Sequence, residues 1–211
     1  MANHYVNMSA EQKTISPEVL RRVVRIQTLT IIWMSVEAGV SLGAAWTARS
    51  PALVAFGGDS AVELLSAGVV LWSFCAPSHE GHGEERVGRI AGGLLFVLAA
   101  FVATTSALTL LGRVEARPST IGIAVLGLAA VIMPWLAAQK QQLSIATGSA
   151  ALRADAAESA ACGYLALIAV AGLAVNAVWK VSWADPVAAL TLLPLIIREG
   201  WEGWKGKPFS G

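Results

Sequence analysis

The chain has 211 residues, of which 55% are hydrophobic and 14% are charged, and its formal net charge is +1. Soluble globular domains carry about 25% charged residues, so this composition excludes an ordinary soluble domain and indicates a membrane protein. The near-neutral charge and the lack of a basic patch in the sequence give no support for nucleic-acid binding.

In chain order, six segments are apolar over the roughly 20 residues that a membrane-spanning helix needs. They are 24–48, 52–74, 87–112, 118–138, 150–178 and 182–200. A polar arm, 1–23, precedes them, and a short tail, 201–211, follows them. We therefore predict an all-α membrane protein with a six-helix transmembrane domain over 24–200 and no C-terminal cytoplasmic domain.

The basic residues predict the orientation of these spans. If both termini lie on one side, that side carries eleven Lys and Arg residues and the other side carries four. The eleven are Lys13, Arg21, Arg22, Arg25, Arg86, Arg89, Lys140, Arg153, Arg198, Lys205 and Lys207. The four are Arg49, Arg113, Arg117 and Lys180. This is the positive-inside pattern, so we predict a multi-pass protein of a bacterial inner membrane with both termini in the cytoplasm.

Aromatic residues support the predicted ends of the spans. Tryptophan is enriched where a membrane protein crosses the interface between lipid and water. Five tryptophans lie near predicted span ends: Trp46, Trp179, Trp183, Trp201 and Trp204.

Acidic residues interrupt the first two spans. Glu37 lies in the middle of the first span, and Asp59 and Glu63 lie four residues apart in the second. Residues with this spacing share one face of a helix. A charge at the membrane centre costs about 2.5–3.5 kcal/mol on insertion scales. Such a pair must be protonated, face water or meet a cation, although it could also serve as polar contacts between helices or as a proton relay.

The connection after the second span, "CAPSHEGHGEER", combines imidazole and carboxylate groups. His79, His82 and Glu84 could form an accessory metal site, because Zn²⁺ accepts both ligand types. The alternative is a solvated polar loop with no specific ligand.

The fifth span repeats part of the second. When residues 149–162 are laid over residues 50–63 without gaps, six positions are identical, Asp59 falls on Glu158 and Glu63 falls on Cys162. The second and fifth spans run in opposite directions if the predicted topology is right. This arrangement is typical of an inverted repeat of three plus three spans, in which the substrate site lies near the membrane midplane.

Three carboxylates and one sulfur on two facing helices suit a tetrahedral divalent ion such as Zn²⁺. The predicted ligands are Asp59, Glu63, Glu158 and Cys162. Thiolate favours softer ions and carboxylate favours harder ones, while Cys162 could instead simply pack between helices. Glu37 could be a fifth ligand, a proton carrier or a hydrogen-bond partner across a helix interface. Asp155 could pair locally or line the entrance to the site.

These patterns resemble the cation diffusion facilitator, or cation efflux, family from the first span to the end of the sixth. The stretch "SAALRADAAESAAC" is similar to the family's fifth-span pattern S-x-A-L-x-A-D-A-x-H-x-x-x-D, and "DSAVE" is similar to the ligand pair of its second span. The opening of the sixth span, "WADPVAAL", and the loop "SHEGHGEERVGRIAGG" are similar to further features of that family. Glu158 and Cys162 stand where the family pattern has His and Asp, so the site would contain no imidazole.

The resemblance implies a homodimeric secondary transporter that exports a divalent transition metal from the cytoplasm by proton antiport. We expect Zn²⁺ as the first substrate and Cd²⁺ as the next, with no prosthetic group and no enzymatic activity. The sequence has no G-x-x-x-x-G-K-[ST] loop for ATP, so an ion gradient would drive transport.

Two other functional classes share some of these features. A passive cation channel or proton conduit would use the same acids without exchanging one ion for another. A membrane metalloenzyme is the weaker alternative, because the chain has only three histidines and no H-E-x-x-H motif.

Overall fold

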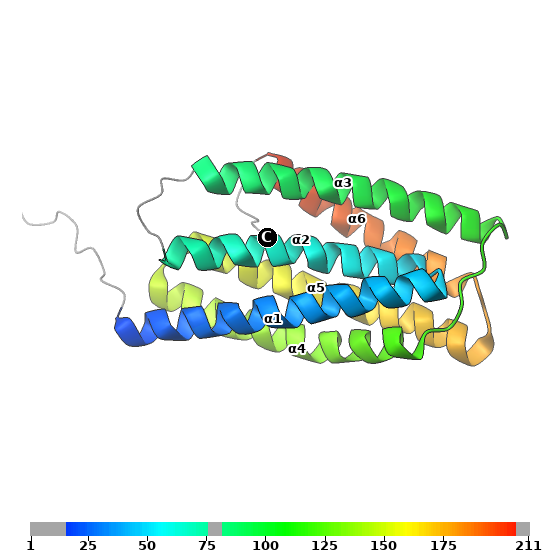
Figure 1. Ribbon diagram of the computed structural model, residues 1–211, viewed down its shortest axis with the longest axis horizontal. Helices are drawn as coiled ribbons and strands as arrows, with labels where there is room; N and C mark the ends of the chain where they lie inside the picture. The colour runs from blue at the N-terminus through cyan, green and yellow to red at the C-terminus, as the bar shows by residue number, and fades with distance from the viewer. Residues whose placement is uncertain (1–15, 76–81, 206–211) are drawn as a thin grey trace, which may run out of the picture.

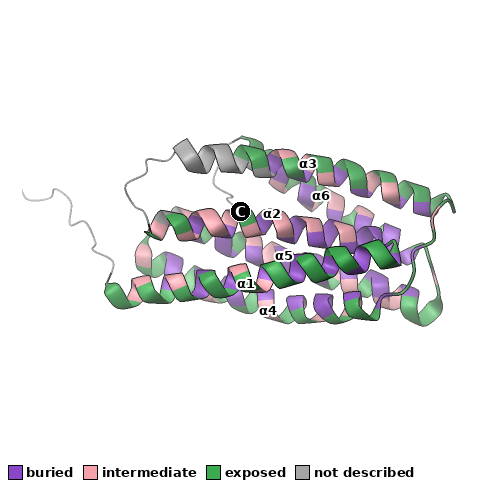
Figure 2. Cartoon of the chain, in the orientation of Figure 1, coloured by how far each residue is buried: buried purple, intermediate pink, exposed green. Residues whose placement is uncertain are grey.

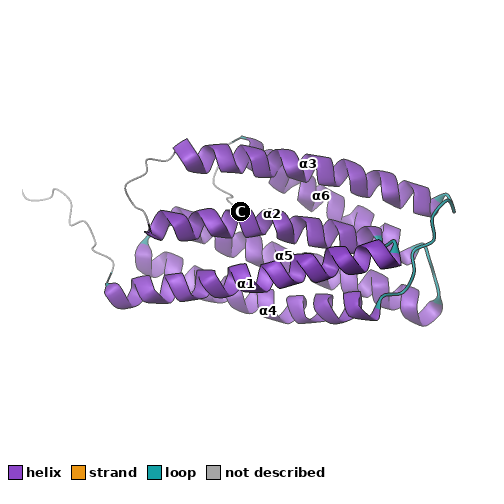
Figure 3. Ribbon diagram, in the orientation of Figure 1, coloured by secondary structure: helices purple, strands orange, loops and turns teal. Residues whose placement is uncertain are grey.

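The computed structural model describes residues 16–75 and 82–205, and within these residues the chain forms six α-helices and no strands. The helices are α1 (Pro17–Ala48), α2 (Pro51–Cys75), α3 (His82–Leu110), α4 (Thr120–Thr147), α5 (Ala150–Trp179) and α6 (Ala184–Trp204). The protein is an all-α membrane protein, as the sequence predicts. Short loops join most of the long helices (Figure 3).

The helices run alternately along one bundle, so that α1 begins and α6 ends toward the same end (Figure 1). Within each half of the chain, α1 packs on α2, α2 on α3, α4 on α5 and α5 on α6. Across the halves, α1 packs on α4, α2 on α5 and α3 on α6. These contacts pair each helix with its counterpart three helices later, which agrees with the predicted inverted repeat.

Several helices extend beyond the apolar spans predicted from the sequence, and α1 and α4 extend furthest. α1 begins at Pro17 because Ser16 caps it, accepting a hydrogen bond from the backbone N–H of Val19, and proline suits a first helical turn. α4 continues to Thr147, past the predicted end at 138, so the polar stretch "AQKQQLS" is also helical. Lys140, which we assigned to a cytoplasmic connection, therefore lies within a helix.

A tight turn fixes α5 directly after α4. Gly148 has φ +72°, a left-handed conformation that glycine adopts easily, and its N–H donates to the carbonyl of Ser144. Ser149 then caps α5, accepting from the N–H of Leu152 at 3.2 Å. This turn begins the repeated segment that contains Glu158 and Cys162.

Among the residues that the structure describes, five helices are long and apolar enough to cross a membrane, namely α1 to α5. The predicted sixth span, α6, is 21 residues long but carries Asp185, Arg198, Glu199 and Glu202. Many large apolar side chains are exposed on the bundle, among them Ile32, Leu108 and Val131. Figure 2 shows such exposed positions along the outward faces of the helices, where lipid would surround them.

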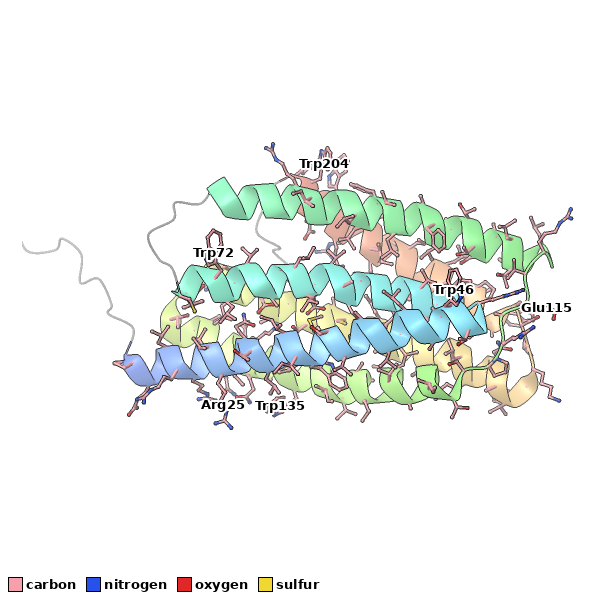
Figure 4. The ribbon with its side chains drawn as sticks, in the orientation of Figure 1. Arg25, Trp46, Trp72, Glu115, Trp135 and Trp204 are labelled. Carbon is pink, nitrogen blue, oxygen red and sulfur yellow. The ribbon has the colours of Figure 1, made fainter. Side chains whose placement is uncertain are left out.

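The tryptophans predicted near span ends are exposed side chains close to helix ends. Trp46, near the end of α1, is 87% exposed. Figure 4 shows Trp46 and Trp72 toward opposite ends of the bundle. This placement suits side chains that contact a lipid–water interface.

Asp185 of α6 binds the N-terminus of α2. Its carboxylate accepts hydrogen bonds from the hydroxyl of Ser50 and, at 3.1 Å, from the backbone N–H of Ala52. A carboxylate at a helix N-terminus satisfies backbone donors that have no partner within the helix. The Asp of the Asp-Pro motif thus fixes the start of the helix that carries Asp59 and Glu63.

A small residue lets α4 and α5 approach closely beside the predicted site. A Cβ added to Gly163 would lie 3.0 Å from the ring of Pro134, which stands inside α4. Small residues at helix interfaces let neighbouring helices pack closely within membranes. Gly163 follows Cys162 directly, so this contact holds the thiol-bearing turn of α5 against α4.

Candidate metal site

Five sequence-predicted residues are almost completely buried inside the bundle. The exposed fractions are 0% for Glu37, 5% for Asp59, 6% for Glu63, 1% for Asp155 and 1% for Cys162. They come from α1, α2 and α5. Glu158, on α5, is partly buried. The acids that the sequence places within apolar spans therefore point into the protein rather than into lipid.

Glu37 lies between α2 and α5. Its Oε1 atom accepts a hydrogen bond from the hydroxyl of Ser60 at 2.6 Å and a weaker one from the thiol of Cys162 at 3.7 Å. The Glu37 side chain also interacts with the indole of Trp33. Glu37 is therefore a hydrogen-bond partner across a helix interface, which is one of the three roles predicted for it. Cys162 also lies next to this buried carboxyl group.

Asp59 contacts a residue that the sequence analysis missed. A side-chain hydrogen bond joins Asp59 on α2 to Glu199 on α6. Glu199 falls just inside the predicted sixth span, and an acid within a predicted span was a usable signal. It was overlooked because "REGWEGW" looks like the polar end of that span.

Glu63 belongs to a network that crosses the bundle. The hydroxyl of Ser159 donates to Glu63 Oε1 at 2.9 Å, and the ammonium of Lys140 donates to Ser159 Oγ at 2.7 Å. Lys140 also forms an ion pair with Asp155 at 2.9 Å. On its other side, Asp155 accepts from the side-chain amide of Gln27 at 2.6 Å. Asp155 therefore pairs locally, which is one of the two roles predicted for it.

Glu158 faces the same acidic interior. Its side chain hydrogen-bonds to Ser66, and it interacts electrostatically with Asp155, Glu63 and Glu199. Its Oε2 atom is buried and has no hydrogen-bond partner. This free oxygen of Glu158 is available to a cation or a proton.

The predicted ligands are neighbours, but they do not form an assembled coordination sphere. Within residues 16–75 and 82–205, no three His, Cys, Asp or Glu side chains form a group that could hold a metal ion. Asp59, Glu63, Glu158 and Cys162 interact at longer range through their charges. Their role as the ligand set remains a prediction.

The predicted accessory site lies outside the part of the chain that can be described. His79 falls within 76–81, beyond the described residues. His82 and Glu84 belong to the first turn of α3, but the placement of their side chains is likewise outside the description. The accessory site therefore also remains a prediction.

Comparison with known proteins gives the family. The profile of the cation efflux transmembrane domain matches residues 28–205, which include most of α1 and all of α2 to α6. The chain belongs to the cation efflux family. The expected resemblance is confirmed, and this cation efflux protein is a multi-pass membrane transporter of cations. Among curated proteins, none matches the chain.

Proposed function

We propose that this cation efflux protein exports a divalent transition metal, Zn²⁺ first and Cd²⁺ next, from the cytoplasm by proton antiport. The observation that carries the proposal is an excess of carboxyl groups inside the bundle, drawn from four helices. The acids that interact with one another are Glu37, Asp59, Glu63, Asp155, Glu158 and Glu199. Asp185 is also buried, but it is engaged by Ser50 and Ala52 at the start of α2. Among the buried residues of the described part of the chain, the one basic side chain is Lys140.

A single ammonium group cannot balance this many carboxylates. Uncompensated charge within a membrane protein is costly, so the remaining acids must hold protons or meet a cation. A divalent ion and two protons bring the same charge into the site. Exchange of one for the other keeps the interior balanced in both states, and this equivalence favours antiport over transport of the metal alone.

The proposed ligand set joins the two halves of the repeat. Asp59 and Glu63 stand on α2 in the first half, and Glu158 and Cys162 stand on α5 in the second. Movement of one three-helix half against the other would bring the ligands together or separate them, which is how alternating access works in inverted-repeat transporters.

The proton step follows from ligand chemistry. Carboxylate and thiolate bind a metal in their deprotonated forms, so metal binding releases protons and protonation releases the metal. We propose that the cytoplasm-facing site binds the ion and that protonation from the opposite side discharges it. The proposal includes an orientation with both termini in the cytoplasm, which the distribution of basic residues supports. It also includes a homodimer, which the family resemblance supports.

Uptake into proteoliposomes tests the proposal. Vesicles containing the purified chain would receive Zn²⁺, Cd²⁺, Mn²⁺, Fe²⁺, Co²⁺ or Ni²⁺ under an imposed pH gradient. We expect the fastest uptake for Zn²⁺, followed by Cd²⁺, and faster uptake with the gradient than without it. Uptake that matches protein-free vesicles for every ion would refute metal transport. A rate of metal uptake that is the same with and without the pH gradient would favour a passive channel.

A further inference from the structure

A lysine is completely buried in the transmembrane bundle. Lys140, on α4, has an exposed fraction of 0%. Its ammonium donates to Asp155 Oδ1 at 2.9 Å and to Ser159 Oγ at 2.7 Å. A lysine inside a membrane protein is costly to bury and is a candidate for a functional role. The proposed ligand set does not use it.

Ser159 connects this lysine to the proposed substrate site. An ammonium group can only donate hydrogen bonds, so Ser159 must accept from Lys140. The hydroxyl has a single proton, which it donates to Glu63 Oε1 at 2.9 Å. The direction of both bonds is therefore fixed, and the positive charge of Lys140 polarises the hydroxyl that holds Glu63.

The other side of the lysine is anchored. Asp155, its ion-pair partner, has an exposed fraction of 1% and also accepts from the amide of Gln27 on α1 at 2.6 Å. The chain of contacts thus runs from α1 through α5 and α4 back to α5 and ends on α2. Because its anchor is buried and bonded on both sides, the ammonium keeps a fixed position relative to Glu63.

We propose that Lys140, acting through Ser159, is a tethered counter-cation that holds Glu63 in the substrate-free carrier and that the divalent substrate must displace. This inference rests on the proposed function and concerns the same site. Metal bound at Glu63 would compete with the Ser159 hydroxyl for Oε1 and would be repelled by the nearby ammonium. The tether lowers the affinity of the site, and weaker binding lets a carrier release its substrate.

The test is a gain of affinity, which damage to the fold would not produce. Zn²⁺ binding to the full chain in detergent would be measured by calorimetry at constant pH for wild type, Ser159→Ala and Ser159→Thr. Ser159→Ala removes the hydroxyl, so we expect roughly ten-fold tighter binding, the size of one hydrogen bond to a charged group. Ser159→Thr keeps the hydroxyl and should stay within about two-fold of wild type.

Lys140 variants provide the second arm. Lys140→Arg keeps the charge and should leave affinity near that of wild type, whereas Lys140→Met should tighten binding. Lys140→Met also leaves the carboxylate of Asp155 buried without its cation, and an unpaired buried charge destabilises a protein. If the single variant does not fold, the double variant Lys140→Met with Asp155→Asn takes its place. Tightening in that double variant supports the proposal, and wild-type or weaker affinity contradicts it.

The outcomes separate this inference from the proposed function. If wild type binds Zn²⁺ and Ser159→Ala binds it equally or more weakly, the tether is wrong and the transporter proposal stands. If wild type binds none of the transition metals, both are overturned. If Ser159→Ala and Ser159→Thr tighten binding equally, the hydroxyl is not what restrains Glu63, and the tether is again refuted.

Discussion

Asp59 on α2 and Glu199 on α6 are joined by a side-chain hydrogen bond between two carboxyl groups. Two neighbouring buried carboxylates repel each other, so the pair favours a bound proton or a cation. Metal binding at Asp59 would compete with a proton held there. The contact also brings α6 to the first residue of the proposed ligand set, which links the last helix to the substrate site.

Loss of Asp59 should abolish transport. Asp59→Ala removes a proposed ligand and one of several mutually repelling acids, so we expect a folded protein with metal uptake at background level. Uptake into proteoliposomes and gel filtration in detergent would measure the two properties. The matched control is Glu115→Gln, which neutralises an exposed acid outside the helices, labelled in Figure 4, and should retain wild-type uptake. Near-normal uptake by Asp59→Ala would remove this residue from the site.

Metal binding should release protons around neutral pH. Carboxyl groups that lie close together titrate as a coupled cluster, so the released protons belong to the cluster as a whole and not to one residue. We expect Glu199→Gln and Glu158→Gln each to lower the number of protons released per ion, because each removes a carboxyl group from the cluster. Calorimetry in buffers of different ionisation enthalpy counts these protons. An unchanged count in both variants between about pH 6 and 8 would place the exchanged protons elsewhere.

Cys162 should set the preference among metals. Its thiol lies 3.7 Å from Glu37 Oε1 and is 1% exposed. Sulfur favours Cd²⁺ and oxygen favours Mn²⁺, so Cys162→Asp should shift relative affinity from Cd²⁺ toward Mn²⁺ by about ten-fold or more if the thiolate is a ligand. Competition binding with both ions measures this ratio. Cys75→Ser, at an exposed cysteine, should leave the ratio unchanged. An unaltered ratio in Cys162→Asp would mean that the thiol only packs.

Asp185 should contribute to stability without contributing to metal affinity. Asp185→Ala removes the acceptor for Ser50 and for the N–H of Ala52, and a hydrogen bond to a charged group is worth about 1.5–3 kcal/mol. We expect a lower melting temperature in detergent and unchanged Zn²⁺ affinity in the folded protein. Ser50→Ala, which leaves the Ala52 contact in place, should have a smaller effect. A large loss of affinity in Asp185→Ala would instead place this acid in the transport site.

Much of the fold could be predicted from the sequence because each apolar segment is long enough to span a membrane. The shared helix face of Asp59 and Glu63 could also be predicted, because residues four apart lie on the same side of a helix. Helix ends were less predictable. Hydropathy falls at the polar stretch after residue 138, yet α4 continues, because a helix can extend beyond its apolar core wherever its polar residues find partners.

The positions of Lys140 and Glu199 could not be predicted for a related reason. By composition, each looks like a charged residue at the end of a span. Lys140 is accommodated inside the bundle only because Asp155 and Ser159 lie opposite it, and Glu199 is a neighbour of Asp59 only because α6 packs on α2. Such pairings depend on the packing of helices that are distant in sequence, and a single sequence does not contain that information.

The most direct test of exchange at the carboxylate site is the internal pH of proteoliposomes while Zn²⁺ enters them. Vesicles would contain the full chain, a trapped pH indicator and a trapped Zn²⁺ indicator, with no pH gradient at the start. Antiport predicts that the interior becomes more alkaline as Zn²⁺ enters, because protons leave in exchange, and that Asp59→Ala abolishes both signals together. Entry of Zn²⁺ with no change of internal pH would contradict the account and would identify a passive channel.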